Sequence, residues 1–421
     1  MLKLFIAGGA ERHCRREVEG LVALEAQDVA TPALYGHGAM PDGIHFVLTA
    51  YLDGARSLQQ QWELLDSRAA GDSAAMALLG RALGLIADMH RKGLVQTDLH
   101  LGNFLLQEQQ LYVIDGDAVQ ALSAGQPLSA EPVEDNLAIF LAQLDPEWDA
   151  LGELLLVDYL QHNPLALNPD RLARQVTQVR QRRLNDYLSK TLRDCTAFAV
   201  RRTWWRFCVV VREELDSLSG LLARPDEAFA AQPLLKDGGS STVARFTQQG
   251  RELVIKRYNI KSVAHWFKRF WRPSRAWHSW LAAHRLQFLG IATPAPLAMI
   301  EQRFGPLRHR AWLITDYCAG VDLLQHLGVD GQVVPSPQTA DAMLTLFGQL
   351  VQARISHGDL KATNLLWYQG RVSLIDLDAM KEHRSDRSWQ LAWQRDRQRF
   401  IRNWPQGSPL ATWLDEHLPR V

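Results

Sequence analysis

The chain has 421 residues, of which 47% are hydrophobic, and it carries 46 basic and 46 acidic side chains. This length is enough for two or three domains with their own cores, and the balanced charge gives no general reason to expect a nucleic-acid partner. The four cysteines have neither metal-binding spacing nor the density of a disulfide scaffold, so we expect a protein of the reducing cytoplasm. No apolar run is long enough to span a membrane.

The first half begins with elements that predict a small lobe. MLKLF (residues 1–5) is a short apolar run, and ERHCRREVEGLVALEA (11–26) is predicted to form a helix. QTDLHLGNFLL (96–106) comes later and is followed by LYVID (111–115), a predicted buried strand that ends in an acidic residue. These elements indicate a strand-containing lobe followed by a larger helical lobe.

A change of composition near residue 190 marks the expected join between two domains. Before it, RLARQVTQVRQRRLNDYL (171–188) is predicted to be a solvated amphipathic helix of the first large lobe. After it, TAFAVRRTWWRFCVVVRE (196–213) is rich in the β-branched and aromatic residues typical of strands. We therefore expect a first domain over residues 1–190 and a second over residues 191–421.

The second half repeats the order of elements of the first. TVARFT (242–247) and ELVIKRY (252–258) are predicted strands, and SRAWHSWLAAHRLQFL (274–289) is a predicted helix that ends before Gly290. SHGDLKATNLLW (356–367) then precedes VSLID (372–376), another predicted buried strand with a terminal acidic residue. A strand-rich lobe is again followed by a helical one.

Three polar residues recur in the two halves at a constant offset of 261 positions: Asp98 and Asp359, Asn103 and Asn364, Asp115 and Asp376. Two other stretches also correspond: VLTAYLDG (47–54) with LITDYCAG (313–320), and DVATPALYG (28–36) with GIATPAPLA (290–298). A repeat of this kind indicates two copies of one domain. We therefore predict an α+β fold of two tandem bilobal domains.

The second half contains candidates for every part that phosphoryl transfer needs. The reaction requires a cation on the nucleotide phosphates, oxygen ligands for Mg²⁺ and a carboxylate that orients the acceptor hydroxyl. A Gly-Gly-Ser turn alone is usually a plain hairpin, so the ordered set carries the prediction. The candidates are Gly238, Gly239, Ser240, Ser241 and Lys256 for ATP, Asp359 and Lys361 for catalysis, and Asn364 and Asp376 for Mg²⁺.

The second half also lacks one expected part. Residues 253–300 contain no Asp or Glu, and the position that aligns with Glu17 of the first half falls near Ser279. Lys256 therefore has no acidic partner on the predicted helix. Two explanations remain open: this half is a degenerate, inactive copy, or another carboxylate or the phosphates themselves orient the lysine.

The first half contains a matching set with a different defect. Two strands and a Gly-rich turn precede Lys256 but have no counterpart before Lys3, so we expect that they are lost or that the true start lies upstream of Met1. Gln96 also stands where the second half has His357, a residue that would brace the loop. The candidates here are Lys3 and Glu17 for ATP, Asp98 for catalysis, and Asn103 and Asp115 for Mg²⁺.

Both halves resemble the bacterial lipopolysaccharide core kinases, a family with a protein-kinase-like fold that phosphorylates sugars of the inner core. The resemblance rests on SHGDLKATNLLW with VSLIDLDAM, on QTDLHLGNFLL with LYVIDGDAV, and on the segment from Arg272 to Glu301 that begins RPSRA. The loop pattern alone is shared with aminoglycoside and choline kinases. The resemblance implies ATP-dependent, Mg²⁺-dependent phosphorylation of an inner-core sugar, heptose being the expected one.

The acceptor is expected to be small. No A-P-E motif follows Asp376, and the helical platform on which protein kinases hold peptides is therefore expected to be largely absent. A sugar kinase of the lipopolysaccharide inner core is the first hypothesis. A kinase of another small hydroxylated substrate, and an inactive tandem pseudokinase that organises core assembly, are the alternatives.

A basic segment of the second small lobe predicts a membrane-facing surface. Residues 253–300 contain eight Lys or Arg and no acidic residue. Such a surface would suit an anionic glycolipid at a bilayer, although a solvated face with the tryptophans in the core is the alternative. We expect a cytoplasmic protein attached peripherally to the inner face of the inner membrane, with no nucleic-acid partner. The tryptophans of this segment are Trp266, Trp271, Trp277 and Trp280.

Overall fold

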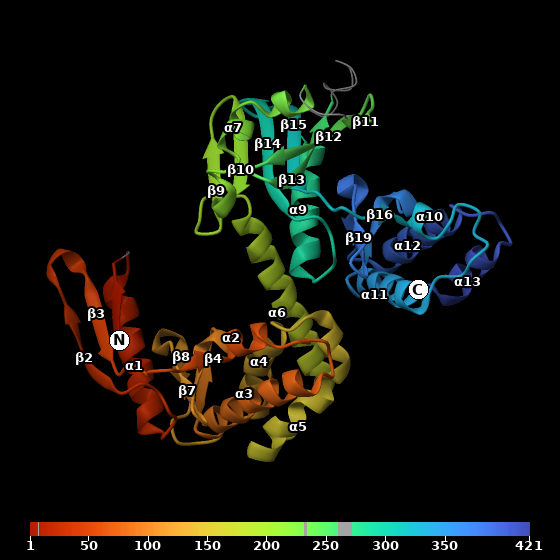
Figure 1. The fold of residues 1–421 in the computed structure, drawn as a ribbon. Coiled ribbons are helices and arrows are strands. Elements are labelled where there is room, and N and C mark those ends of the chain that lie inside the picture. Colours follow the sequence, from red (N-terminus) through yellow and green to blue (C-terminus); the bar gives the residue numbers. More distant parts are fainter. Residues whose placement is uncertain (7, 231–233, 260–271) are drawn as a thin grey trace. The chain divides into compact units, whose positions relative to one another are not determined.

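The structure is a computed structural model of residues 1–421 and describes all of them except 7, 231–233 and 260–271 (Figure 1). Contacts within the chain divide it into two units, Met1–Arg183 and Leu184–Val421. The division falls inside helix α6 (Pro169–Lys190), whose last residue is the join expected from the sequence. The domain ranges 1–190 and 191–421 stay a prediction.

The first unit begins with a small antiparallel sheet and one helix. Strands β1 (Leu2–Phe5), β3 (His45–Thr49) and β2 (Leu34–Ala39) lie in the order β1-β3-β2. Helix α1 (Ala10–Ala26) packs against this sheet through an apolar cluster that includes Cys14, Leu21 and Val47. The strand expected in MLKLF and the helix expected over 11–26 are thus both present.

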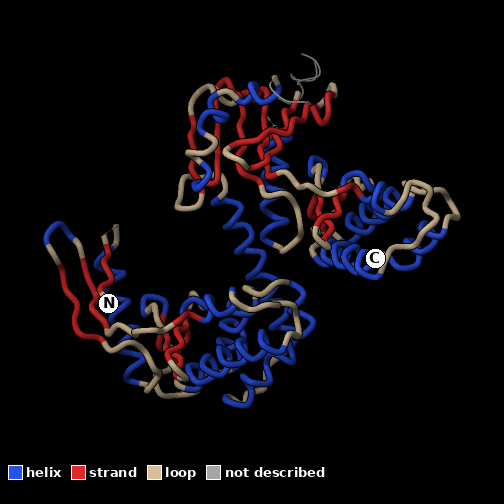
Figure 2. Tube along the Cα trace, in the orientation of Figure 1, coloured by secondary structure: helices blue, strands red, loops and turns tan. Residues whose placement is uncertain are grey.

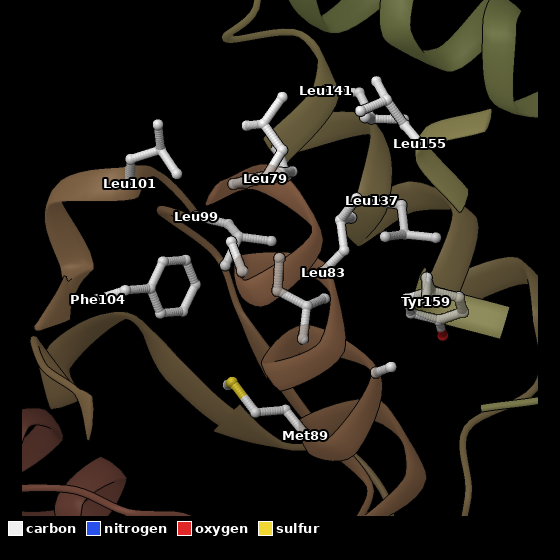
Figure 3. Packing of buried hydrophobic residues seen from close by; sticks show 14 of the residues in the cluster. Leu79, Leu83, Met89, Leu99, Leu101, Phe104, Leu137, Leu141, Leu155 and Tyr159 are labelled. Carbon is white, nitrogen blue, oxygen red and sulfur yellow. The ribbon is translucent and has the colours of Figure 1, made fainter. Parts of the chain in front are cut away.

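The larger part of the first unit is mainly helical. Figure 3 shows its core, in which Leu79 and Leu83 of α3 face Leu137 of α4 and Tyr159 of α5. Two small sheets, β4-β6-β7 and β5-β8, lie beside these helices (Figure 2). The elements are β4 (Arg56–Ser57), α2 (Leu58–Glu63), α3 (Ser73–Arg91), β5 (Leu94–Gln96), β6 (Phe104–Gln107), β7 (Gln110–Val113), β8 (Val119–Ala121), α4 (Ala130–Leu141), α5 (Gly152–His162) and α6.

A buried histidine links three of these helices. His90 of α3 is fully buried, with Nδ1 3.0 Å from the hydroxyl oxygen of Tyr159 and Nε2 3.0 Å from Oδ1 of Asn136. Burial disfavours the charged imidazolium and lowers the pKa of His90 from 6.5 to about 4. The native first unit therefore keeps this side chain neutral at physiological pH.

The first unit is expected to lose stability as pH falls from about 6.5 to about 4. The unfolded chain protonates His90 near pH 6.5, whereas the folded chain does so only near pH 4. This difference removes about 3 kcal/mol from the free energy of unfolding across that window. Urea unfolding at several pH values, for the unmodified chain and His90→Gln, measures it. The same pH dependence in both proteins would contradict the assignment.

The second unit begins with a seven-stranded antiparallel sheet in the order β11-β12-β13-β15-β14-β10-β9 (Figures 1 and 2). One face packs on α9 (Arg275–Phe288) through Trp280 and Tyr258, and the other on α7 (Ser219–Ala223) through Leu222 and Ile255. The strands are β9 (Phe198–Arg202), β10 (Arg206–Val211), β11 (Leu234–Asp237), β12 (Ser241–Gln248), β13 (Arg251–Tyr258), β14 (Pro296–Phe304) and β15 (Leu307–Asp316).

These elements confirm the strands expected in 196–213, 242–247 and 252–258 and the helix expected over 274–289. They do not confirm the expected tryptophan surface. Trp280 is fully buried, and the half-buried Trp277 packs its ring 5.0 Å from that of Phe207. Trp266 and Trp271 lie outside the described residues. Of the two tryptophans that the structure describes in this segment, Trp280 is therefore a core residue and Trp277 packs against the core, as in the alternative interpretation.

The rest of the second unit repeats the arrangement of the first. Helix α12 packs on α11 through Trp393, Phe400 and Phe347. Small sheets β16-β18-β19 and β17-β20 flank the helices. Among the described helices, none combines the length and the apolar character that a bilayer span requires. The elements are β16 (Val321–Asp322), α10 (Leu323–His326), α11 (Pro337–Gln352), β17 (Ile355–Ser356), β18 (Leu365–Tyr368), β19 (Arg371–Leu374), β20 (Lys381–Glu382), α12 (Asp386–Ile401) and α13 (Pro409–His417).

Candidate active sites

The two DLxxxN loops close in the same way. Asn103 Nδ2 donates to the backbone oxygen of Asp98 at 2.8 Å, and Asn364 Nδ2 donates to that of Asp359 at 2.8 Å. Each bond uses the amide nitrogen, so the amide oxygen of the asparagine is the atom left to bind a cation. Each asparagine ends a short 3₁₀ turn that leads directly into a strand, β6 or β18.

A strand delivers the second acidic residue beside each loop. Ile114, after β7, donates its N–H to the backbone oxygen of Asn103 at 3.0 Å, and Ile375, after β19, does the same to Asn364 at 3.0 Å. The next residue in each case, Asp115 or Asp376, has a left-handed backbone with φ of 68° or 60°. This conformation is uncommon for a residue with a side chain and ends the strand at the site.

Gln96 makes the brace that its histidine counterpart makes in the other unit. Gln96 Nε2 donates to the backbone oxygen of Ile114 at 2.9 Å, and His357 Nε2 lies 2.9 Å from that of Ile375. Both side chains are buried. Gln96 therefore braces the first loop as His357 braces the second, because its amide group replaces the imidazole as donor.

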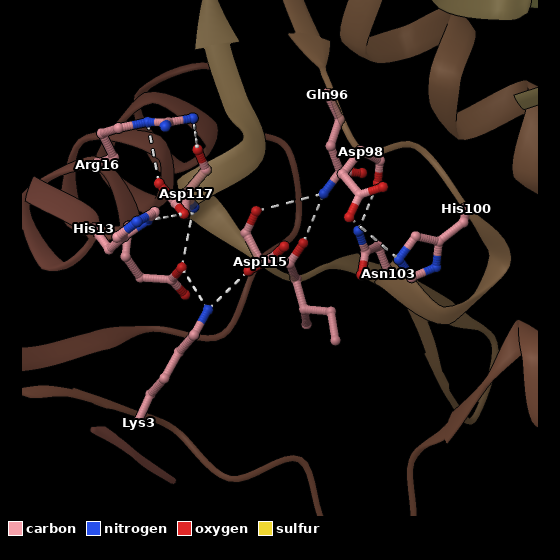
Figure 4. Close-up of polar contacts among 11 residues, drawn as sticks. Lys3, His13, Arg16, Gln96, Asp98, His100, Asn103, Asp115 and Asp117 are labelled. Carbon is pink, nitrogen blue, oxygen red and sulfur yellow. Dashed lines mark hydrogen bonds and ion pairs between the residues drawn. The ribbon is translucent and has the colours of Figure 1, made fainter. Parts of the chain in front are cut away.

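Lys3 lies between two carboxylates in the first unit (Figure 4). Its Nζ is 2.7 Å from Glu17 Oε2 and 2.8 Å from Asp115 Oδ1, so the expected contact with the helix glutamate is present. Burial would lower the pKa of Lys3, but the hydrogen bonds to Asp115 and Glu17 outweigh it and raise this pKa above 10.5. Lys3 is therefore a fixed cation beside Asp115.

The second acidic residue of this turn, Asp117, faces helix α1 and not the lysine. Its carboxylate lies 2.7 Å from His13 Nδ1 and 3.0 Å from Arg16 Nε (Figure 4). The helix comes unusually close to the turn because glycines meet there: a Cβ on Gly20 would lie only 2.0 Å from the backbone oxygen of Gly116. Helix α1 thus supplies the carboxylate for the lysine and two basic groups for Asp117.

Lys256 has two acidic partners, and both lie in the turn that follows β19, not on an α-helix. Its Nζ lies 2.6 Å from Asp376 Oδ1 and 3.0 Å from Asp378 Oδ1, and its side chain is mostly buried. Burial would raise the pKa of Asp376, but the charge of Lys256 outweighs it and lowers this pKa below its usual 3.8. Asp378 is thus the residue that could replace the missing glutamate of the helix, as one of the two open explanations requires.

Asp378 connects Lys256 to helix α9. Its Oδ1 accepts hydrogen bonds from the Tyr258 hydroxyl at 2.8 Å and from Ser279 Oγ at 2.9 Å. Ser279 lies near the position that aligns with Glu17, so the helix here contributes a hydroxyl and the turn contributes the carboxylate. Sequence reasoning missed Asp378. The signal for it was the second Asp of the DLD triplet in a half that has no acidic residue on its helix.

The two candidate catalytic aspartates differ in their exposure and in the cationic side chains that contact them. Asp359 is two-thirds buried and contacts Lys361, at 3.3 Å, and Arg399 of α12. Asp98 has 71% of its side chain exposed, and its ion-pair contact within the described residues is His100 at 3.8 Å. The contact of Asp359 with Lys361 was expected from the DLK pattern, whereas Arg399 carried no sequence signal that could have identified it.

The Gly-rich segment forms the expected turn between β11 and β12. The N–H of Gly238 donates to the backbone oxygen of Ser241 at 3.1 Å, and Asn259 Nδ2 donates to that of Gly238 at 3.2 Å. No described residue beyond its chain neighbours lies within 4 Å of where a Cβ of Gly239 would be. In the first unit β1 lies at the edge of its sheet and pairs with β3. Its counterpart in the second unit, β13, lies inside its sheet and pairs with both β15 and β12.

The structure therefore brings the predicted residues of each half together as two separate sets. In the second, the lysine, the two acidic residues and the asparagine surround one turn, with the Gly-rich turn on the adjoining strand pair. In the first, the same groups are present, apart from the Gly-rich turn. A lysine paired with a carboxylate, next to a loop that carries an asparagine and a further aspartate, is an arrangement able to bind a nucleotide phosphate and a divalent cation.

The chain is similar to one known protein family and to a solved structure. The sequence model of the lipopolysaccharide kinase (Kdo/WaaP) family matches residues 9–124 and 232–402, more than half of the chain. Among solved structures, "WaaP in complex with acyl carrier protein" is similar at 20% identity and a TM-score of 0.34, over 46% of this chain and 79% of that one. None of the curated proteins matches the chain significantly. The α+β chain described here belongs to the lipopolysaccharide kinase (Kdo/WaaP) family.

Proposed function

We propose that this chain transfers the γ-phosphoryl group of ATP to a sugar hydroxyl of the lipopolysaccharide inner core, with a heptose as acceptor. The observation that carries the proposal is the second-unit set, in which Lys256 lies 2.6 Å from Asp376 beside the loop of Asp359 and Asn364. Membership of a lipopolysaccharide kinase family narrows the acceptor from any small hydroxylated molecule to a glycolipid core.

The residues of the second unit fit Mg²⁺ by their chemistry. Carboxylate and amide oxygens are the ligands that this cation prefers, and Asp376 and Asn364 offer both. The amide nitrogen of Asn364 already donates to the backbone oxygen of Asp359, so its amide oxygen is the atom that could bind the metal. When bound with ATP, Mg²⁺ would neutralise charge on the phosphate oxygens. Asn103 and Asp115 would be the corresponding ligands in the first unit.

Different residues of the second unit would act on the acceptor hydroxyl, the transferring group and the nucleotide phosphates. Asp359 would orient the acceptor hydroxyl and take its proton while the hydroxyl oxygen bonds to the γ-phosphorus and the bond from that phosphorus to the ADP leaving group breaks. Lys361, 3.3 Å from Asp359, would neutralise the transferring group, and Lys256 would hold the nucleotide phosphates under the backbone of the Gly238–Ser241 turn. Both lysines would thus act on charge that increases during the reaction.

The two units are proposed to be tandem copies of one kinase-like domain. Three hydrogen bonds recur in the two loops: the asparagine closure, the bond from the isoleucine N–H to the asparagine backbone oxygen, and the brace made by Gln96 or His357. Asp98, with Lys3 and Glu17, would be the second centre of the same chemistry. Its more exposed aspartate supports a smaller contribution to turnover than that of Asp359.

Phosphate transfer from radiolabelled ATP tests the proposal. Purified full-length chain is incubated with labelled ATP, Mg²⁺ and lipopolysaccharide whose inner core lacks phosphate, and the label in the glycolipid is counted. Label that requires all three components supports the function. Absence of transfer to any inner-core acceptor would refute it, and transfer to a small aminoglycoside or choline instead would favour the alternative acceptor class.

Replacing Asp378 by Asn is expected to lower kcat/KM for ATP by about 10- to 100-fold. Removing one of the two carboxylates loosens Lys256, which then binds the phosphates in a less defined position. Asp378→Glu should restore part of the activity because it keeps the charge. Asp117→Asn, at the matching position of the first unit, is the control because Asp117 contacts α1 and not Lys3. Equal losses in the two Asn variants would contradict this positioning role.

A further inference from the structure

Three large aromatic side chains are exposed together at one end of the seven-stranded sheet. Trp204 and Trp205 form the turn between β9 and β10, and Phe304 begins the turn between β14 and β15. Their exposed fractions are 60%, 63% and 53%. The ring of Phe304 lies 6.0 Å from that of Trp204 and 5.1 Å from that of Trp205. These three residues are called the aromatic tip.

The backbone holds the aromatic tip in this exposed position. The two turns are joined by hydrogen bonds of 2.8 Å, from the N–H of Arg303 to the oxygen of Trp205 and from the N–H of Gly305 to that of Trp204. Gly305 has a φ of 59°, and a Cβ there would lie 2.9 Å from the Trp204 ring, so a glycine is needed for the contact. Folding thus maintains an apolar cluster in water, which is unfavourable unless it has a partner.

The charge around the aromatic tip is positive. Arg201 and Arg202 end β9 and are exposed, as is Arg310 of β15. Strands β9, β10, β14 and β15 contain two acidic residues, and neither offsets this charge at the tip. Glu301 is buried and paired with Arg303 and Arg308, and Asp316 ends β15 at its far end, where it pairs with Arg251.

We propose that the aromatic tip inserts into the interface of an anionic phospholipid bilayer and anchors the second unit there. Tryptophan prefers the bilayer interface, where its ring is buried among lipid headgroups. Arginines beside it would contact lipid phosphates, each worth about 1 kcal/mol near an anionic surface. Two projecting turns with cationic flanks fit a deformable, negatively charged surface better than a preformed protein groove.

This inference rests on the proposed function and extends it. An enzyme that modifies a glycolipid has to work at a membrane surface, and the aromatic tip would hold it there. It also moves the expected membrane contact. The sequence had assigned that contact to residues 253–300, whose described tryptophans lie in or against the core, whereas the aromatic tip comes from two other hairpins of the same sheet.

Sedimentation with vesicles tests the inference on the full-length chain. We expect binding to vesicles of phosphatidylethanolamine and phosphatidylglycerol, weakened at least about tenfold by the triple change Trp204→Ser, Trp205→Ser and Phe304→Ser. The matched control changes two aromatic residues exposed elsewhere, Tyr35→Ser and Tyr368→Ser, and should bind as the unmodified chain does.

The arginine variant and a kinase assay separate the possible outcomes. Arg201→Gln with Arg310→Gln should weaken binding to anionic vesicles and leave the weaker binding to phosphatidylcholine vesicles unchanged. No vesicle binding by the unmodified chain, or unchanged binding by a triple variant with an unaltered thermal unfolding midpoint, would overturn the inference. Transfer to a deacylated, water-soluble core oligosaccharide is measured in parallel: its failure would count against the proposed function and leave the membrane anchor standing.

Discussion

Asp359→Asn is expected to reduce ATP-dependent phosphate transfer by about 10²- to 10⁴-fold, the usual loss when a positioned general base is removed. The amide cannot accept the hydroxyl proton, yet it has nearly the same size and can keep the loop in place. In the structure Asp359 is two-thirds buried and held by Lys361 and Arg399, so its carboxylate is already fixed for an acceptor. Initial rates at saturating ATP, with the acceptor varied, measure the loss.

Asp98→Asn is the internal control for this prediction and should give a smaller loss. Asp98 has 71% of its side chain exposed, and among the described residues its ion-pair contact, His100 at 3.8 Å, is more distant than the cationic partners of Asp359. Equal partial losses in the two variants would mean that both units turn over at similar rates. A larger loss for Asp98→Asn would place the main centre in the first unit and contradict the ranking proposed here.

Lys256→Met is expected to be the second large effect, a fall in kcat of about 10²- to 10³-fold. Methionine keeps the length and apolar character of the stem but removes the cation that would hold the phosphates. It also leaves Asp376 and Asp378, now without their shared lysine, close together in a mostly buried setting. Loss of this shared cation is expected to lower stability as well.

The kinetic and the structural effects of this change can be separated. Thermal unfolding with and without Mg²⁺ should show that the metal restores stability to Lys256→Met, because a divalent cation can neutralise the two carboxylates that have lost their lysine. Lys256→Arg keeps the charge but not the compact ammonium group and should recover stability more than rate. Activity of Lys256→Met near that of the unmodified chain would show that Lys256 does not bind the nucleotide.

Much of each candidate site could be predicted from the sequence because its parts are local. The loop and the acidic residue after the next strand keep fixed spacings in both halves, and short-range hydrogen bonds from Asn364 and His357 set their geometry. The strand of Lys256 and the helix of Ser279 were also predictable, since apolar periodicity defines both elements.

What the sequence could not show depends on contacts between distant segments. Asp378 reaches Lys256 across 122 positions, and Arg399 reaches Asp359 from a helix with no distinguishing pattern. The burial of Trp280 depends on which face of its helix meets the sheet. Charge counting placed it on a surface, whereas the structure packs it against the sheet, with its indole N–H donating to the backbone oxygen of Thr191.

The most direct test of the central claim is the mass of the acceptor after reaction. Lipopolysaccharide lacking inner-core phosphate is treated with ATP, Mg²⁺ and either the unmodified chain, Asp98→Asn, Asp359→Asn or the double variant, and the core is analysed by mass spectrometry. The account predicts an added phosphate on the core sugar with the unmodified chain, much less with Asp359→Asn and none with the double variant. An unphosphorylated core with the unmodified chain, or full phosphorylation by the double variant, would contradict it.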